Sequence, residues 1–381
     1  MAKKQIIIMA VIALLANVCR AETAREALNR NLIKLPAGFK IEIYADNVPD
    51  ARSMAVSSSG IVFVGSRDAG NVYALIDKDN DKKAEEVKII ASGLNQPNGV
   101  ALLNGSLYVA EISRILRYDD IDTRIDIDEI TNNQDTDSKK IKPKVINDSY
   151  PKDEHHGWKY IAFGPDGKLY VPVGVPCNIC KSKDEIYGTI TRMNADGTGR
   201  EIFARGIRNT VGFDWHPETK ELWFTENGRD WMGDDVPPDE LCKAAKAGLH
   251  FGFPYCHGFL ILDPEFGEGK DCNDYVKPEI ELAPHTAALG MKFYIGEMFG
   301  DEYKGQIFIA EHGSWNRSEP IGYRVMIVTM RNGKAENYQV FAEGWLQDGK
   351  AWGRPVDVAI MSDGSMLVSD DKAGVVYRIY K

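Results

Sequence analysis

The chain has 381 residues, a formal net charge of −10 and 44% hydrophobic residues. This composition is typical of a globular protein and provides enough apolar side chains for a large core. Because the charge balance is acidic and no run of basic residues occurs, the composition argues against a protein that binds nucleic acid.

The start of the chain differs from the rest. Lys3 and Lys4 precede an apolar run at 6–16, and small residues follow it. The run is too short to span a bilayer and is typical of a secretory signal peptide, with an N-terminal anchor helix or a lipoprotein signal as the alternative. We therefore predict a signal peptide at 1–21 and a periplasmic or secreted protein at 22–381. Its net charge is −13, because three basic residues are lost, and no later segment is apolar enough to span a membrane.

The mature chain contains a weak repeat of short strands and tight turns. Each unit has an apolar strand, a turn that often contains glycine, and a second strand with an aromatic or aliphatic triplet. The triplets lie at Val62–Val64, Leu107–Val109, Leu169–Val171, Leu222–Phe224, Ile307–Ile309 and Met366–Val368. Further strands follow several units, which leaves room for four strands in each. The pattern predicts an all-β fold, a single six-bladed β-propeller of four-stranded antiparallel blades. A pair of β-sandwiches would explain the strands but not the six similar hairpins.

Two insertions interrupt the repeat, at 119–154 and at 229–285. Long loops on a rigid scaffold are where binding and catalytic residues tend to lie. We therefore expect the insertions to shape any binding pocket.

Five cysteines remain after the signal peptide, so at least one is unpaired within the chain. An exported protein can form disulfides, and we predict one between Cys256 and Cys272, which flank a polar loop. Cys177 and Cys180 are predicted to form a local disulfide, with a redox pair or half of a metal site as alternatives. The pairing of Cys242 stays open.

Polar residues mark the ends of the predicted inner strands. In a propeller blade the second strand returns to the face at which the first strand starts, so residues before first strands and after second strands gather on one face. These positions hold Arg67, Gln96, Asn98, His155, His156, Arg208, Asn209, Glu226, Asn227, Arg229, Glu311, His312, Arg354, Asp370 and Asp371. Cations and imidazoles on one rim suit an anionic ligand with a polar reaction centre. For each residue taken singly, a solvated charge or a turn cap is the alternative.

Several motifs together resemble the glucose/sorbosone dehydrogenases, quinoproteins that use pyrroloquinoline quinone (PQQ). The motifs are His155–Tyr160, Phe163–Val171, Arg205–Asn209, Glu226–Asp230, Pro238–Leu241 and Glu311–Arg317. The resemblance runs from about residue 35 to the C-terminus and is nearest to the sorbosone and pyranose dehydrogenase branch. It implies a soluble enzyme that oxidises an aldose or a related sugar.

The resemblance also implies roles for individual residues. His156 matches the general base that takes a proton from the sugar hydroxyl while hydride passes to the quinone, and Arg208 matches an arginine beside the reacting quinone oxygen. The backbone carbonyls of Gly228 and Arg229 match a calcium site, since calcium takes oxygen ligands. The predicted cofactor contacts are Arg67, Asn98, Asn209, Asn227, His312, Arg317 and Arg354, in which the arginines suit the carboxylates of PQQ.

One departure from the pattern concerns the base. The glucose enzymes place an aspartate after the second strand of the third blade, and this chain has Val175 there. The group that orients His156 must therefore come from elsewhere or be absent. The departures from the pattern leave the sugar open.

Two other functions compete with the dehydrogenase. A calcium-dependent propeller hydrolase of the lactonase type would centre on carboxylates and asparagines, whereas this rim is rich in arginine and histidine. A non-enzymatic binding propeller would use the rim only for recognition. The chain has no haem-attachment motif, so a dehydrogenase would pass its electrons to a separate acceptor, a quinone or a cytochrome.

Overall fold

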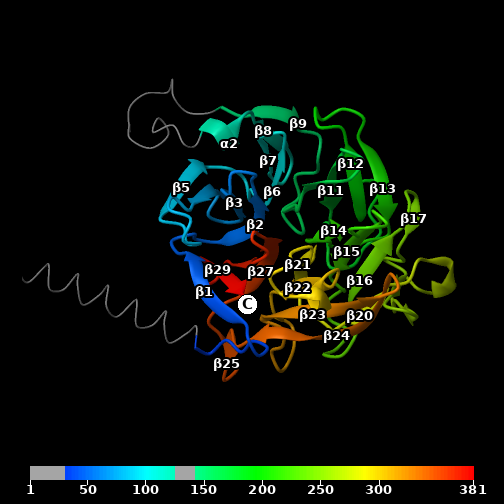
Figure 1. Ribbon diagram of the computed structural model, residues 1–381. Coiled ribbons are helices and arrows are strands. Elements are labelled where there is room, and N and C mark those ends of the chain that lie inside the picture. The colour runs from blue at the N-terminus through cyan, green and yellow to red at the C-terminus, as the bar shows by residue number, and fades with distance from the viewer. Residues whose placement is uncertain (1–30, 125–141) are drawn as a thin grey trace, which may run out of the picture.

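The computed structural model describes residues 31–124 and 142–381, and these form a six-bladed β-propeller of antiparallel sheets, as the repeat predicts (Figure 1). Blade 1 contains β2 (Ala51–Val56), β3 (Val62–Ser66), β4 (Val72–Ile76) and β5 (Glu86–Ala91). Blade 2 contains β6 (Gly99–Leu103), β7 (Ser106–Ala110), β8 (Ile115–Tyr118) and β9 (Lys144–Asn147). Blade 3 contains β10 (Ala162–Phe163), β11 (Leu169–Val173), β12 (Thr189–Met193), β13 (Glu201–Arg205) and a short parallel strand, β17 (Leu249–His250).

The remaining blades follow in chain order. Blade 4 contains β14 (Phe213–Trp215), β15 (Leu222–Glu226), β16 (Asp239–Ala244) and β20 (Ile280–Leu282). Blade 5 contains β21 (Ala288–Phe293), β22 (Ile307–Glu311), β23 (Arg324–Arg331) and β24 (Lys334–Glu343). Blade 6 contains β27 (Pro355–Ile360), β28 (Met366–Asp370), β29 (Val375–Tyr380) and, from the other end of the chain, β1 (Lys40–Ala45). Outside the blades lie α2 (Ile121–Arg124), β18 (Cys256–His257), β19 (Ile261–Leu262), β25 (Leu346–Gln347), β26 (Lys350–Ala351) and the 3-10 turns Cys272–Asp274 and Asp301–Tyr303.

Strand β1 closes the ring. It pairs antiparallel with β29, with Lys40 opposite Tyr380, so the blue and red strands lie side by side in Figure 1. Because the two strands come from opposite ends of the described chain, their hydrogen bonds hold the first and last blades together.

Apolar side chains fill the space between neighbouring blades. The triplets lie on the second strands, which are buried throughout in blades 1, 3, 4, 5 and 6. Phe308 of blade 5, for example, packs in one cluster with Phe341 of the same blade and with Val368 and Tyr377 of blade 6. Since both faces of each inner strand are covered by a neighbouring blade, the strands read as apolar runs rather than as alternating patterns.

The innermost strands crowd around the central axis and are irregular at one end. A side chain at Gly290 in β21 would collide with Asp357 in β27, because a Cβ there would lie 2.0 Å from the carboxylate. The pairing of β2, β21 and β27 with their neighbours shifts register near the start of each strand. Such bulges turn side chains away from the sheet, and here they occur beside the pocket described below.

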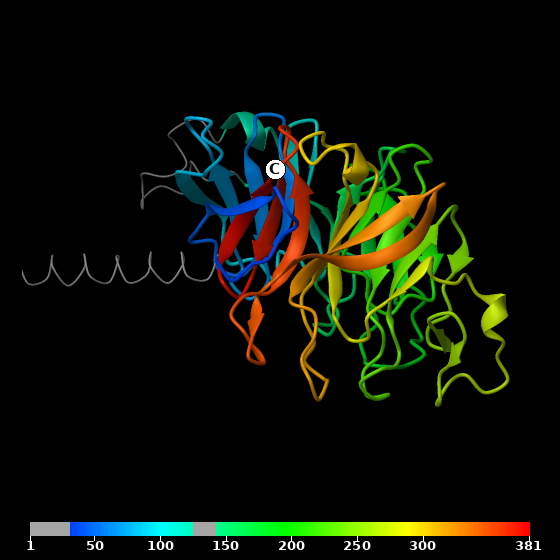
Figure 2. The ribbon, with the colours of Figure 1, turned by 60° about the horizontal axis from the view of Figure 1, so that its bottom comes forward.

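The two segments predicted as insertions include strands that belong to the blades. Strand β9 of blade 2 lies within 119–154, and 125–141 lie outside the described residues. Strands β16 and β20 belong to blade 4, while the segment between them carries β17 to β19 and, as Figure 2 shows in yellow-green, extends from the side of the propeller. The predicted signal peptide at 1–21 lies outside the described residues. Among the helices that the structure describes, none is long and apolar enough to cross a membrane.

Candidate active site

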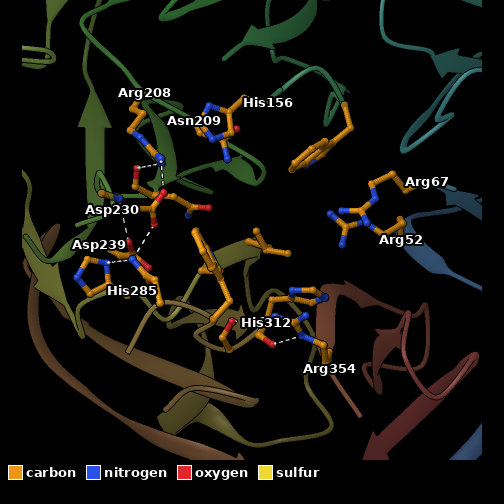
Figure 3. Close-up of a pocket in the computed structure, with 18 residues that line it drawn as sticks. Arg52, Arg67, His156, Arg208, Asn209, Asp230, Asp239, His285, His312 and Arg354 are labelled. Carbon is orange, nitrogen blue, oxygen red and sulfur yellow. Dashed lines mark hydrogen bonds and ion pairs between the residues drawn. The ribbon is translucent and has the colours of Figure 1, made fainter. Parts of the chain in front are cut away.

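A polar cavity of about 280 Å³ opens at one end of the propeller axis (Figure 3). It is lined by Arg52, Arg67, His156, Trp158, Arg208, Asn209, Asn227, Gly228, Asp230, Asp239, His285, Ala287, Leu289, His312, Gly313, Trp315, Asn316 and Arg354. Most of these residues lie near the starts of first strands and the ends of second strands, which is the rim that the repeat predicts, and Asp239 lies at the start of the third strand of blade 4. Of the predicted site residues, eight reach the cavity: His156, Arg208, Arg67, Asn209, Asn227, Gly228, His312 and Arg354.

His156 is held in one tautomer. Its Nδ1 lies 2.9 Å from the carbonyl oxygen of Val175. A carbonyl can only accept, so Nδ1 carries the hydrogen and Nε2 keeps a free lone pair. Val175, which replaces the expected aspartate, therefore orients His156 through its backbone carbonyl instead of a side chain. Burial, reinforced by the positive charges of Arg208 and His155, holds the pKa of His156 well below its usual range, so the ring is neutral at pH 7.

The residue that packs against the backbone of His156 has no room for a side chain. His156 has a φ of 52°, in the left-handed region that most side chains avoid. Gly174 packs directly beneath it, and a Cβ at Gly174 would lie 2.5 Å from the Cβ of His156 and 3.2 Å from Oδ1 of Asn209. Gly174 thus allows both residues to reach the cavity from neighbouring loops.

Arg208 is buried and held on several sides. Its Nε donates to the carbonyl of Asn178 at 2.7 Å, and its Nη1 donates to the carbonyl of Asn227 at 3.2 Å. Its Nη2 donates to Oδ1 of Asn178 and forms an ion pair with Asp230, both at 3.0 Å. Burial lowers the pKa of Arg208 against the opposing effect of Asp230, yet a guanidinium remains charged at neutral pH. The arrangement fixes one positive charge beside His156 with little freedom to move.

Glu226, at the end of β15, holds the backbone segment that carries Arg208 and Asn209. Its carboxylate accepts hydrogen bonds from the backbone nitrogens of Arg208 and Asn209, and from the hydroxyl of Thr210 at 3.2 Å. Burial and the nearby Glu240 raise the pKa of Glu226 to about 8. The carboxyl group therefore determines where the segment that carries Arg208 and Asn209 turns into the cavity.

Three arginines line the other side of the cavity, as Figure 3 shows for Arg52, Arg67 and Arg354. Arg52 pairs with Asp371 at 2.9 Å, and Arg67 pairs with Asp68 at 2.9 Å and stacks over the Trp158 ring at 5.2 Å. Arg354 donates to backbone carbonyls, and no carboxylate of the described residues lies within ion-pair distance of it. Burial is the main cause that lowers its pKa, and the charges of Arg52 and Arg67 add to it. Positive charge therefore accumulates here without full compensation.

His312 joins this group through Asp371. Its Nε2 lies 2.9 Å from the carboxylate of Asp371, and burial lowers the pKa of His312 to about 4. Burial alone would raise the pKa of Asp371, but His312 and Arg52 outweigh it and hold the pKa well below its usual range. Asp371 is thus an anion that binds a neutral imidazole and one arginine.

Two buried polar atoms of the lining have no partner among the described residues. They are Nε1 of Trp158, a donor, and Oδ1 of Asn316, an acceptor. Buried polar groups in proteins are nearly always hydrogen-bonded, so such orphans at a cavity indicate atoms that serve a ligand.

Comparison with known proteins places this geometry in a family. The TrAA12-like family model matches residues 184–381. The chain belongs to the TrAA12-like family. The resemblance to quinoprotein sugar dehydrogenases that the sequence motifs indicate is confirmed.

The chain is also similar to individual proteins. An uncharacterised protein of Borreliella burgdorferi is 35% identical, covering 91% of this chain and 90% of that protein. The pyrroloquinoline quinone-dependent pyranose dehydrogenase of Coprinopsis cinerea is 33% identical over 28% of this chain and 17% of its own length.

Solved structures share the fold at low identity. The calcium structure of the Trichoderma reesei carbohydrate-active enzyme of family AA12 has a TM-score of 0.75 at 17% identity and covers 91% of this chain and 96% of that one. The holo form of the PQQ domain of the Coprinopsis cinerea pyranose dehydrogenase has a TM-score of 0.73 at 16% identity and covers 92% and 97%.

Three predicted residues of this TrAA12-like chain do not line the cavity. The Oδ1 of Asn98 accepts from Nε of Arg52 at 2.8 Å, so Asn98 supports the pocket from behind. Arg229 pairs with Asp263 at 2.7 Å in the segment that extends from blade 4. Arg317 donates to the backbone carbonyl of Asp234 and ties together two loops at the mouth.

Gly228 lines the cavity, and its environment is buried and acidic. Its backbone nitrogen donates to Oδ1 of Asp239 at 2.9 Å, and a Cβ at Gly228 would lie 2.6 Å from the carbonyl of Pro238. Asp239 thereby fixes the orientation of this peptide. Burial is the main cause that raises the pKa of Asp239, and the hydrogen bonds that its carboxylate accepts from the backbone nitrogens of Gly228 and Ala288 oppose it.

The structure contains disulfides between Cys177 and Cys180 and between Cys256 and Cys272, while Cys242 is buried and free. The shorter disulfide encloses Asn178, which binds Arg208. It therefore stabilises a loop of the active site rather than the fold as a whole.

Sequence reasoning missed Arg52, Asn178 and His285. Arg52 lies inside β2, where the register shift turns it into the cavity, and no turn or motif marks that bulge in the sequence. Asn178 lies in the middle of the Cys177–Cys180 segment, which could have drawn attention to it. His285 lies three residues before β21, and the rule that selected the other rim residues would have found it if it had been applied to blade 5.

Proposed function

We propose that this protein is a quinoprotein dehydrogenase that oxidises a hydroxyl of an aldose or a related sugar of the pyranose type. The observation that carries the proposal is the position of His156: a neutral imidazole with a fixed tautomer, beside the charged Arg208, at the edge of a cavity lined with arginines. A base and a fixed cation at one point are what proton removal from a hydroxyl requires.

The lining fits PQQ, a planar tricarboxylate with an ortho-quinone. Arg52, Arg67 and Arg354 would hold its carboxylates, because a guanidinium binds a carboxylate through paired hydrogen bonds. The orphaned Nε1 of Trp158 would donate to one of its oxygens, and Asn209 and Asn227 border the same space. When bound, PQQ would supply the hydride acceptor, and a calcium ion at the backbone carbonyl of Gly228 would make it more electrophilic.

The residues of the chain supply the proton chemistry. Nε2 of His156 accepts the proton of the sugar hydroxyl, and the low pKa of His156 keeps that nitrogen free at pH 7. The Val175 carbonyl stabilises the imidazolium that results, since Nδ1 keeps its hydrogen bond throughout. With PQQ bound, Arg208 would stabilise the negative charge that develops on the quinone oxygen. Asp230 and Asn178 hold its guanidinium in place.

The comparisons support the same reaction class. A relative and a structural neighbour carry the names of PQQ-dependent pyranose dehydrogenases, and another neighbour with a TM-score of 0.62 is described as the PQQ-bound form of an aldose sugar dehydrogenase from Streptomyces coelicolor. Electrons would leave to a separate acceptor. Two disulfides are consistent with the predicted export to the periplasm or the exterior.

The experiment that tests the proposal compares matched histidine variants. His156→Gln is expected to bind PQQ in the presence of calcium yet to lose ~10²–10⁴-fold in sugar-dependent dye reduction, the range for a general base. His216→Gln, in the β14–β15 turn, should match the parent protein. A His156→Gln protein with the turnover of the parent would refute the proposed base. Failure of the parent to bind PQQ would instead favour a hydrolase or a binding propeller.

A further inference from the structure

Two tryptophans stand exposed at the mouth of the cavity. The side chains of Trp231 and Trp315 are 68% and 65% exposed, although tryptophan is normally well buried. Their rings contact each other edge to face, with centroids 5.3 Å apart, and Trp315 lines the cavity. Adjacent exposed aromatic rings form a rigid apolar surface, which is a feature of binding sites rather than of ordinary protein surface.

The loops that carry the tryptophans are tied to each other. Asn316 donates from Nδ2 to Oδ1 of Asp230 at 2.9 Å, Arg317 donates to the carbonyl of Asp234, and the nitrogen of Ser318 donates to the Asp234 carboxylate at 3.1 Å. Both tryptophans are thus held in place without being buried. This also gives Arg317 a role that differs from the predicted cofactor contact.

One polar atom of this surface lacks a partner. Nδ2 of Asn316 is used by Asp230 and by Nδ1 of His285 at 3.4 Å, while Oδ1 of Asn316 is buried and accepts from no described residue. An apolar ring face beside a free hydrogen-bond acceptor matches a pyranose, which has an apolar C–H face and hydroxyl donors at its edge.

The surface lies close to the reaction centre but outside it. The carboxylate of Asp230 connects the two regions, because it binds Asn316 through Oδ1 and Arg208 through Oδ2 at 3.0 Å. The cavity of about 280 Å³ is close to the lower limit, about 300 Å³, of pockets that hold one small ligand. With PQQ in it, the reacting sugar would lie at the opening, and the next glycosyl unit would extend over the tryptophans.

On the basis of the proposed function, we propose that Trp231, Trp315 and Asn316 form a second saccharide subsite. It binds the glycosyl unit adjacent to the one that is oxidised, so that the protein takes oligosaccharides in preference to free monosaccharides.

Steady-state kinetics of the PQQ- and calcium-loaded protein test this inference, with glucose compared with cellobiose and xylose compared with xylobiose. The ratio of kcat/KM for disaccharide over monosaccharide should exceed one in the parent. Trp315→Ala and Trp231→Ala should each reduce that ratio ~3- to 10-fold through KM, and Trp315→Phe should restore part of it. Leu260→Ala, a matched truncation of an apolar side chain that is 60% exposed, should leave the ratio unchanged. Equal ratios in parent and Trp315→Ala would overturn the subsite, as would a Trp315→Ala effect confined to the KM for the electron acceptor.

A binding measurement separates this inference from the proposed function. Cellobiose or xylobiose should quench the tryptophan emission of the cofactor-free parent but not that of the Trp231→Ala, Trp315→Ala double variant. Quenching without any sugar oxidation would retain the subsite and refute the dehydrogenase. Oxidation of sugars with neither quenching nor a changed ratio would retain the dehydrogenase and refute the subsite.

Discussion

Replacing Gly174 by alanine should disable the active site without touching any ligand. Gly174 does not line the cavity, and its backbone lies outside the left-handed region, so alanine changes only the occupied space. The added Cβ would lie 2.5 Å from the Cβ of His156. Carbon atoms pack at about 3.5 Å or more, so His156 must move by about 1 Å.

That displacement sets the size of the expected effect. Moving a catalytic group by about 1 Å costs on the order of 10²-fold in rate, because the reacting atoms leave their productive geometry. Overpacking of this kind lowers the free energy of unfolding by about 1–3 kcal/mol. We therefore expect Gly174→Ala to stay folded, to bind PQQ and calcium, and to lose roughly 10²-fold in kcat.

Gly296→Ala is the matched control. A Cβ at Gly296 would lie 2.7 Å from Cα of Gly364, in the turn between β27 and β28 at the opposite end of blade 6 from the cavity. Gly296→Ala should lower the thermal midpoint by about as much as Gly174→Ala does and leave kcat unchanged. If Gly174→Ala kept the kcat of the parent while folded and loaded with cofactor, or if both variants lost kcat equally, the role assigned to the position of His156 would be wrong.

Three further predictions concern the surroundings of the reaction centre. Glu226 has a pKa of about 8 in the folded protein, so the folded state holds more protons than the unfolded state between about pH 4.5 and 8, and its contribution to stability is lost as pH rises through that window. Urea unfolding at pH 6 and pH 9 should therefore show that the free energy of unfolding of Glu226→Gln rises relative to that of the parent as pH rises, by at most ~1.4 kcal/mol per pH unit. A difference between the two free energies that does not change with pH would contradict this. Removing both Cys177 and Cys180 by serine substitution should reduce kcat and cost about 2 kcal/mol of stability, whereas removing the Cys256–Cys272 disulfide, which closes a longer loop, should cost about 3 kcal/mol and leave kcat unchanged; a loss of kcat in the second variant but not in the first would disprove the assignment. Arg354→Lys should raise the Kd for PQQ roughly 10- to 100-fold through the loss of a charged, bidentate contact, and an unchanged Kd would exclude Arg354 as a carboxylate ligand.

The fold could be predicted because its unit is local. Each hairpin joins neighbours in the chain, and the triplets that mark the second strands, such as Ile307–Ile309, are the segments that the blades bury. The closing strand β1 was not foreseen, since its pairing with β29 joins the two ends of the described chain and depends on no turn signal.

The site could be predicted only to the level of the rim. Strand ends place His156, Arg208 and Arg354 on one face, but they do not determine where each side chain points. Asn98 satisfies the same rule and turns to a protein partner instead. Arg317, which the family resemblance selects, also turns to a protein partner. Contacts that backbone atoms make in the site cannot be predicted from the residue types.

Val175 is the clearest instance of such a contribution. Its side chain cannot replace a carboxylate, and from the sequence the base has no orienting partner. In the structure its carbonyl oxygen takes that role at 2.9 Å from Nδ1 of His156. A neutral acceptor fixes the same tautomer as a carboxylate but stabilises the imidazolium less, so this base should be weaker than one paired with aspartate.

The proposed function requires that the arginine-lined cavity binds PQQ and that the protein uses it to oxidise a sugar. The most direct test is a spectral titration of metal-stripped protein with PQQ in the presence of calcium, followed by addition of a panel of aldoses and their disaccharides. We expect stoichiometric binding, with a quinone absorption that a sugar bleaches and that an electron-accepting dye restores. If PQQ does not bind, or binds and is bleached by no sugar in the parent, the proposed function is contradicted.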